Sequence, residues 1–103
     1  MTQFDVCLNT ADNADKYPYV VVLQSSLIQF DDQSVVAPLS RSHRYKKALQ
    51  VCPQTVVDDE EWMLVIPQLA SIPNHFIGKK VASMQEQRSD IISAIDRLFT
   101  GIG

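Results

Sequence analysis

Short apolar runs separated by polar turns fill most of the chain, and this pattern predicts β-strands within residues 3–77. We predict a strand at residues 17–26, in which residues 20–23 are continuously apolar, and residues 62–66 are likewise apolar without alternation. Such runs are typical of strands buried on both faces. An acidic turn separates residues 55–57 from residues 62–66, so we predict a hairpin there. The remaining predicted strands are residues 3–8 and residues 34–39. Residues 68–72, between two prolines, are predicted as an irregular extension of the strand 62–66, and residues 76–80 as a connection to the C-terminal segment.

The C-terminal part of the chain has a helical period instead. At about 100° per residue, one arc of residues 84–100 is apolar, and we predict an amphipathic helix there. Ser83 followed by Glu86 is a capping-box pattern, which indicates the helix start. Gly101 suits the left-handed residue that ends a helix. The apolar arc consists of Met84, Ile91, Ala94, Ile95, Leu98 and Phe99, with Ile92 at its edge. We expect this arc to be buried and the opposite side of the helix, with Ser89, Ser93, Asp96 and Thr100, to be exposed.

Ile102 lies beyond the predicted helix end and has a poor partner within the helix. A residue in this place normally contacts the residue four or five positions earlier, which is Leu98 or Arg97, with Arg97 expected. A charged side chain is a poor partner for an isoleucine. Ile102 must therefore pack on another element or remain available to a second protein.

Five predicted strands followed by one helix exclude a helix-covered parallel sheet. The order favours a mainly β fold, an antiparallel sheet or small barrel with a C-terminal helix at one side, in a single domain over residues 1–103. One helix covers only part of one sheet face. The strands that are apolar on both faces therefore need barrel closure or a second subunit, and we predict a two-fold homodimer.

Composition and charge narrow the functional classes. An apolar fraction of 46% with only three glycines in 103 residues favours a globular domain over a disordered chain. A net charge of −3 gives no global attraction to nucleic acid or to an anionic membrane. No apolar run approaches the roughly 20 residues of a membrane span, and the N-terminus lacks the pattern of a signal peptide. Cys7 and Cys52 lack metal or redox spacing and are expected to be reduced and buried, which predicts a cytoplasmic protein.

Candidate catalytic groups are few. Residues 41–50 hold four of the nine basic residues. This suggests either a nucleic-acid patch or, as we favour, a solvated loop or small excursion, because no phosphate-binding glycines accompany the basic residues. His43 and His75 lie in predicted irregular segments, and neighbouring residues supply no obvious nucleophile or orienting carboxylate. A ribonuclease-like arrangement of His43, Arg44 and His75 stays as the less favoured alternative.

The acidic residues 58–61 are a candidate site for a hard cation. A calcium loop spaces its ligands and uses a glycine to turn, whereas adjacent strand residues point to opposite sides. We therefore interpret this run as a solvated hairpin tip and expect no metal and no cofactor. Nucleotide-binding, zinc-binding and nucleophile motifs are absent from the sequence, which favours a binding protein over an enzyme.

Short motifs in a fixed order cover nearly the whole chain. They are QFDV at 3–6, VVLQSSLI at 21–28, VAPL at 36–39, DEEW at 59–62, ASIP at 70–73, IGKKV at 77–81, DIISAI at 90–95 and FTGI at 99–102. In this order they resemble the CcdB family, the toxins of bacterial toxin–antitoxin modules. The match is weakest at residues 9–16 and 40–51.

The resemblance implies a dimeric, partly open antiparallel β-barrel with a C-terminal helix, related to the MazF and Kid toxins. It also implies a non-enzymatic activity. CcdB-like toxins bind the A subunit of DNA gyrase and trap the gyrase–DNA complex in its cleaved state. A disordered segment of a CcdA-like antitoxin wraps the toxin dimer and reverses the poisoning.

Site residues follow from the resemblance by matching position. The gyrase surface would comprise the end of the helix, the tail and two apolar residues after the second strand, namely Leu27, Ile28, Asp96, Phe99, Thr100, Gly101 and Ile102. The antitoxin would be held by the loop after the first strand, which here comprises Leu8, Asn9, Thr10, Ala11, Asp12, Asn13, Ala14 and Asp15.

The tail departs from the family pattern at two positions. Thr100 stands where the best-known family tail has a tryptophan, and Gly103 is an added residue. A tryptophan is a strong interface anchor. The first alternative is therefore a CcdB-fold homologue that binds antitoxin but poisons gyrase weakly or not at all. The second alternative is a MazF-like endoribonuclease toxin that uses residues 41–47 and His75.

Overall fold

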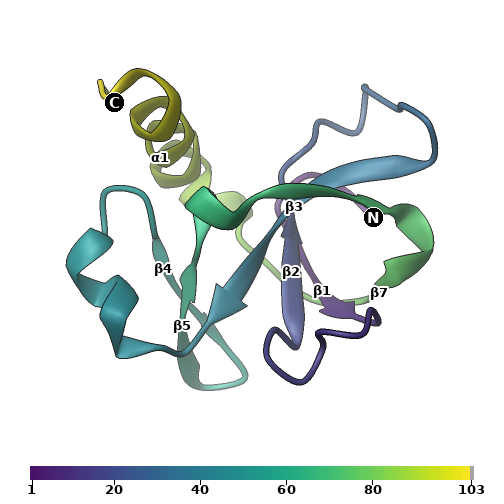
Figure 1. Ribbon diagram of the computed structural model, residues 1–103, viewed down its shortest axis with the longest axis horizontal. Coiled ribbons are helices and arrows are strands. Elements are labelled where there is room, and N and C mark those ends of the chain that lie inside the picture. The colour runs from purple at the N-terminus through teal and green to yellow at the C-terminus, as the bar shows by residue number, and fades with distance from the viewer. Residues whose placement is uncertain (103) are drawn as a thin grey trace.

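The computed structural model describes residues 1–102, so the added Gly103 lies outside the described residues. The fold is mostly β, with a C-terminal helix α1 (Arg88–Thr100) that stands at one side of the strands (Figure 1). Short 3₁₀ segments connect the elements at η1 (His43–Ala48), η2 (Ile66–Gln68), η3 (Asn74–Phe76) and η4 (Gln85–Gln87). The strands are β1 (Asp5–Asn9), β2 (Tyr19–Val22), β3 (Gln33–Ser40), β4 (Gln54–Val57), β5 (Glu60–Leu64), β6 (Ala70–Pro73) and β7 (Ile77–Ser83).

The long strand β3 organises the sheet. Neighbouring strands follow the order β4-β5-β3-β2-β1-β7, all antiparallel, and β6 also pairs with β3. β6 pairs with the first half of β3, from Gln33 to Val36, whereas β5 pairs with Leu39 and Ser40 at its end. The sheet curls into a half-barrel (Figure 1). The predicted fold class, a mainly β, partly open barrel with a C-terminal helix, is confirmed.

Two strands were missing from the sequence prediction. β6 was predicted as an irregular extension, and β7 was predicted as a connection to the helix; β7 runs to Ser83, so the limit of residues 3–77 for the strands is wrong. β7 pairs only with β1, and an edge strand tolerates exposed lysines such as Lys79 and Lys80. Gly78 permits a close approach, because a Cβ there would lie 3.0 Å from the carbonyl oxygen of Leu8.

The predicted start of the helix is also wrong. Ser83 is the last residue of β7, where it pairs with Asp5, and its hydroxyl accepts a hydrogen bond from the Gln85 N–H at 3.1 Å. Glu86 lies in η4, and α1 begins at Arg88 without a side-chain cap. The predicted end is confirmed, because Gly101 has a φ of 73° and donates its N–H to the Arg97 carbonyl at 2.9 Å.

The β4–β5 hairpin has the solvated acidic tip that the sequence predicted. Asp58 and Asp59 both have left-handed backbones, with φ of 55° and 65°, as two-residue hairpin turns require. Glu60 and Glu61, at the start of β5, are exposed.

Both faces of the sheet are buried within a single chain. Residues of α1, including Ile91 and Ala94, cover the main core. The opposite face holds a second cluster of Cys7, Val20, Val22 and Val36, against which Ile72 and Ile77 pack. Because these last two residues come from β6 and β7, curling of the sheet covers this face. Barrel closure, one of the two predicted solutions, thus accounts for the burial, and the homodimer stays a prediction.

Cys7 and Cys52 are free and buried, as predicted. Burial raises the pKa of both thiols, and the negative charge of Asp5 raises that of Cys7 further. Because the thiolate is the reactive form, we expect a thiol-exchange reagent at pH 7 to label neither cysteine in the folded protein and both after unfolding in guanidinium. Labelling of the folded protein as fast as a small free thiol would contradict this prediction.

Asp5 is a buried carboxylate that ties the N-terminus to the sheet. Its Oδ2 accepts hydrogen bonds from the backbone N–H and the hydroxyl of Thr2, at 2.8 and 2.9 Å. The Lys80 ammonium lies 3.3 Å from Oδ1, as an ion pair without hydrogen-bond geometry. Burial raises the pKa of Asp5, but the bonds from Thr2 and the charge of Lys80 outweigh burial, so the net pKa lies below its usual value.

Asp5→Asn is expected to destabilise the fold by about 1 kcal/mol near pH 7, because charge-assisted hydrogen bonds are lost. A lowered folded-state pKa means that this stabilisation is complete above the unfolded-state pKa and is lost as the pH falls through the folded-state pKa. In urea unfolding, the difference in free energy of unfolding between wild type and variant should decrease when the pH falls below 3.8, the pKa of the aspartate in the unfolded state. Asp15→Asn, at an exposed loop carboxylate, is the control. A difference that does not change with pH would contradict this account.

Candidate functional site

The last turn of α1 extends beyond the core. Ile91 and Ala94, in the first half of the helix, are buried, whereas Phe99 is 69% exposed. The prediction that Phe99 belongs to a buried arc is therefore wrong; Figure 1 shows the C-terminal end of α1 standing clear of the strands. Asp96 and Thr100 are exposed, as their place opposite the apolar arc predicted.

The tail after α1 presents an apolar side chain to solvent. Ile102 is 80% exposed, so of the two alternatives that the sequence left open, packing on another element is wrong. The Thr100 hydroxyl contacts the tail backbone, because it accepts a hydrogen bond from the Ile102 N–H at 3.1 Å. Phe99 and Ile102 therefore form an exposed apolar pair next to the end of the helix.

The loop between β2 and β3, residues 24–32, carries a second exposed apolar group. Leu27 is 92% exposed and Ile28 is 60% exposed. Gln24 fixes the loop from inside: its amide donates to the Ile28 carbonyl at 2.7 Å, and its side-chain oxygen accepts from the Val35 N–H at 3.1 Å. The loop thus has a defined conformation in which apolar side chains face outward.

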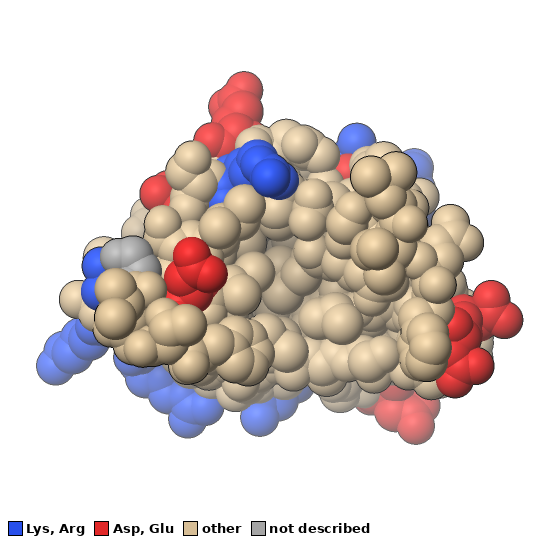
Figure 2. Space-filling view, turned by 90° about the horizontal axis from the view of Figure 1, so that it is seen from above, with Lys and Arg blue, Asp and Glu red and all other residues tan. Residues whose placement is uncertain are grey.

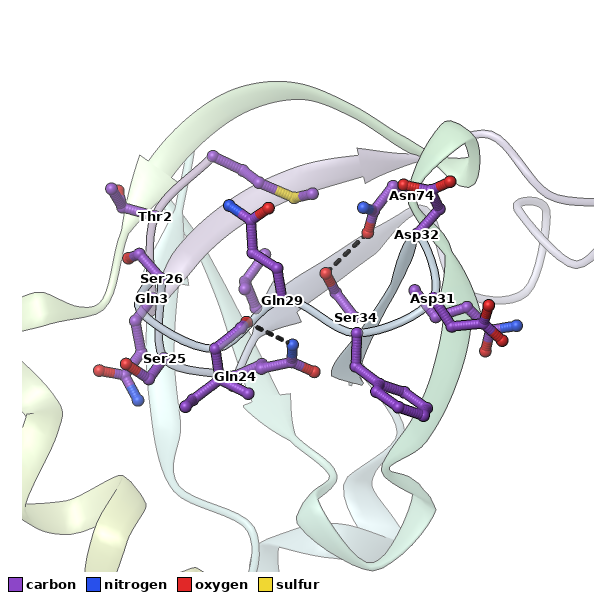
Figure 3. A pocket seen from close by; sticks show the side chains of 15 residues that line it. Thr2, Gln3, Gln24, Ser25, Ser26, Gln29, Asp31, Asp32, Ser34 and Asn74 are labelled. Carbon is purple, nitrogen blue, oxygen red and sulfur yellow. Dashed lines mark hydrogen bonds between the residues drawn. The ribbon is translucent and has the colours of Figure 1, made fainter.

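A polar pocket of about 260 Å³ lies against this loop (Figure 3). Its lining consists mainly of amide and hydroxyl side chains, and Ser34 donates a hydrogen bond to the Asn74 side-chain oxygen at 2.7 Å. Figure 3 shows Thr2 and Gln3 on the opposite side of the pocket from Asn74. The polar interior supports the backbone of the loop.

Phe30 belongs to the exposed apolar group of this loop, and sequence reasoning missed it. It is 77% exposed. The next two residues, Asp31 and Asp32, have left-handed backbones with φ of 59° and 53°, and the Gln33 N–H donates to the Phe30 carbonyl at 3.1 Å. The available signal was an aromatic residue directly before a turn, where few neighbours can cover it.

The two apolar groups lie at the same end of the molecule. In Figure 1 the end of α1 and the loop of residues 24–32 both point upward, on opposite sides. Figure 2, seen from above, shows a hollow between them that is lined mostly by uncharged side chains, with charged groups beside it and most others toward the edges. The seven residues predicted for the gyrase surface therefore form two separate groups. One group lies on the helix end and the tail, and the other lies on the loop of residues 24–32. A weakly charged surface lies between them.

The loop after β1 is organised by Asn9. This buried side chain donates to Asn13 Oδ1 at 2.9 Å and to the Tyr17 carbonyl at 2.7 Å, and it accepts from the Ala11 N–H at 3.0 Å. Leu8 lies in β1 and is 38% exposed, and the chain bends at Ala11 and forms turns over residues 12–16. The eight residues of the predicted antitoxin loop thus lie together, with Asn9 as the anchor.

A shallow, mainly apolar groove of about 520 Å³ lies beside this loop. Asn9, Ala11, Asp12 and Asn13 line one part of the groove. The rest is lined by Tyr17, Val20, Val36, Pro38, Gln68, Ala70, Ile72, Pro73 and Phe76. The groove therefore joins the predicted antitoxin loop to an apolar surface made by β2, β3 and β6.

A family model described as CcdB protein matches residues 3–101. The chain belongs to the CcdB family. Family membership supports a CcdB-type toxin of a toxin–antitoxin system. The matched range includes both exposed apolar groups up to Gly101, the loop after β1 and the groove beside it. Within residues 1–102, no helix is long and apolar enough to span a membrane.

The groups considered for catalysis in this CcdB-family chain do not come together. η1, with His43 and Arg44, and η3, with His75, lie at opposite sides of the molecule in Figure 1. The His75 ring packs on Phe76, with centroids 4.3 Å apart. Within residues 1–102, no group of three or more acidic, histidine and cysteine side chains is arranged to hold a metal ion.

The basic segment of residues 41–50 is a structured excursion, in line with the favoured interpretation. Arg41 pairs with Glu60 at 2.6 Å, and Lys46 pairs with Glu61 at 2.9 Å. Tyr45 and Ala48 pack on a small cluster around Cys52 and β5. Two of its four basic side chains are thus held by acidic residues of the hairpin, which disfavours a phosphate-binding role.

Proposed function

We propose that this chain is a cytoplasmic toxin that binds the A subunit of DNA gyrase and traps the cleaved gyrase–DNA complex. It acts without catalysis of its own, as a homodimer, and a CcdA-like antitoxin neutralises it. The observation that carries the proposal is the gathering of exposed apolar side chains at one end of a CcdB-family fold. Those side chains are Leu27, Ile28, Phe30, Phe99 and Ile102.

Exposed apolar side chains in one region are typical of a protein interface. Single exposed apolar residues need no explanation, but here two ordered groups flank one weakly charged hollow (Figure 2). The interface uses Leu27 and Ile28 from the loop, with Asp96, Phe99, Thr100, Gly101 and Ile102 from the helix end and tail. We add Phe30 to this set because it continues the apolar loop group.

The antitoxin binds at the loop of residues 8–15 and in the groove beside it. An apolar groove with a polar rim fits a segment that alternates apolar contacts with backbone hydrogen bonds. This groove and the gyrase surface are built from different elements, so an antitoxin segment in the groove and gyrase contact different residues of the chain. The homodimer is tested by sedimentation, in which a stable monomer at micromolar concentration would overturn it.

Induced expression in bacterial cells tests the main proposal. Toxicity is expected in cells with sensitive gyrase, and it should disappear in cells with a resistant A subunit or with a CcdA-type partner. Toxicity that persists on resistant gyrase, with cleavage of messenger RNA, would favour the MazF-like endoribonuclease. A non-toxic chain would favour the second candidate.

That second candidate is a CcdB-fold homologue that retains antitoxin binding but poisons gyrase weakly or not at all. The observation in its favour is Thr100, a small side chain at the exposed end of α1 where an aromatic anchor would bind more tightly. Binding of the purified chain to an antitoxin segment, without binding to the gyrase A subunit, would support it over the main proposal.

A further inference from the structure

The hydroxyl of Thr100 contacts both the last turn of α1 and the backbone of Ile102. It donates toward the Asp96 carbonyl at 2.6 Å and accepts from the Ile102 N–H at 3.1 Å. The Ile102 carbonyl also lies 2.9 Å from the same oxygen. Since a hydroxyl has one proton, it donates to one carbonyl at a time, and the shorter distance favours Asp96.

These contacts link the last turn of α1 to the residue after it. The Asp96 carbonyl belongs to the helix, and the Ile102 N–H lies beyond the residue that ends it. Gly101 turns the chain with a φ of 73°, and its N–H is already bound to the Arg97 carbonyl at 2.9 Å. Within residues 1–102, backbone hydrogen bonds hold the chain only as far as Gly101. The Thr100 hydroxyl extends this by bridging the helix and the backbone of Ile102.

We infer that Thr100 is a positioning residue whose hydroxyl fixes the direction in which Ile102 leaves the helix. The inference rests on the proposed function for its partner, the gyrase A subunit. Ile102 has no buried contact to hold it, since its side chain is 80% exposed. Without the bridge the tail would sample many conformations, and the entropy of ordering it would be lost on binding.

This role differs from that of a contact residue. A contact residue contributes through the atoms that it buries in the partner, so both its methyl and its hydroxyl would matter. A positioning residue requires only the hydroxyl, because that oxygen holds Ile102. Thr100→Val keeps the shape and the branching of the side chain and removes the hydroxyl, whereas Thr100→Ser keeps the hydroxyl and removes the methyl.

The experiment measures tail order and binding in the same full-length variants. Tail order is read from the ¹H–¹⁵N heteronuclear NOE of the Ile102 amide in the free protein, which reports picosecond-to-nanosecond motion. Affinity for the gyrase A subunit is read by titration calorimetry. Thr55→Val makes the same change, loss of a hydroxyl from a threonine, on β4, outside both proposed binding surfaces, and serves as the control.

We expect Thr100→Val to lower the Ile102 NOE toward values of a flexible chain and to weaken gyrase binding about 3- to 10-fold. Thr100→Ser restores both the NOE and the affinity, and Thr55→Val changes neither. An equally ordered Ile102 in Thr100→Val would overturn the inference, as would a disordered tail with unchanged affinity. A wild-type chain that does not bind the subunit would overturn the proposed function instead, and the NOE comparison would then decide by itself whether Thr100 positions the tail.

Discussion

Ile102→Ala is expected to weaken binding to the gyrase A subunit by about 2 kcal/mol, or roughly 30-fold. The side chain is 80% exposed in the free chain, so its burial in a partner would contribute nearly its full transfer free energy. The fold should not change, because Ile102 makes no contact with the core clusters within residues 1–102.

Val56→Ala is the matched control for this variant. Val56 is also β-branched and is 62% exposed, but it lies on β4, away from the two apolar groups. Both variants should have wild-type unfolding curves in urea, and only Ile102→Ala should lose affinity and toxicity. Equal affinity of Ile102→Ala and wild type would contradict the assignment of the tail to the interface.

Local sequence rules succeeded where local interactions decide the structure. The β4–β5 hairpin was predicted from its acidic turn, and Asp58 and Asp59 adopt the left-handed backbones of a short hairpin. Gly101 was predicted as the helix end and has the expected positive φ. In each case the residues that determine the conformation are adjacent in the chain.

The same rules failed where a distant strand competes for the residue. Ser83 has the sequence context of a helix cap, but it pairs with Asp5 of β1. Strand pairing therefore prevails over the local capping pattern, and α1 begins only at Arg88. β7 was missed because its lysines and Gly78 give no clear alternation, and only the contact with β1 stabilises it as a strand. Such pairings between residues far apart in the chain are not visible in a single sequence.

The candidate surfaces show a similar division. Leu27 and Ile28 were predicted for the gyrase surface by resemblance, whereas Phe30, whose signal was its place directly before a turn, was not predicted to be exposed. The groove beside the loop after β1 joins three strands with that loop, so no continuous motif encodes it. Its lining came only from the three-dimensional structure.

Ala70→Asp is expected to weaken antitoxin binding by about 3 kcal/mol, or roughly 100-fold. Ala70 lines the apolar groove and is exposed in the free chain, so the carboxylate stays hydrated until a partner covers it. A bound apolar segment would desolvate that charge without a counter-ion, which costs several kcal/mol. Asp12 on the rim of the same groove adds a like charge.

Ser71→Asp is the matched control, because Ser71 is the next residue of β6 and adjacent strand residues point to opposite sides. It introduces the same charge on the same strand, and Ser71 does not line the groove. Affinity is measured by calorimetry with an antitoxin segment, and function by rescue of induced cells.

The two readouts separate the two partners. Because Ala70 lies outside the proposed gyrase surface, Ala70→Asp should remain as toxic as wild type, while co-expressed antitoxin should no longer rescue the cells. Ser71→Asp should be toxic and still rescued. Rescue of both variants would mean that the antitoxin does not use the groove, and loss of rescue in both would mean that the added charge acts at a distance rather than by contact.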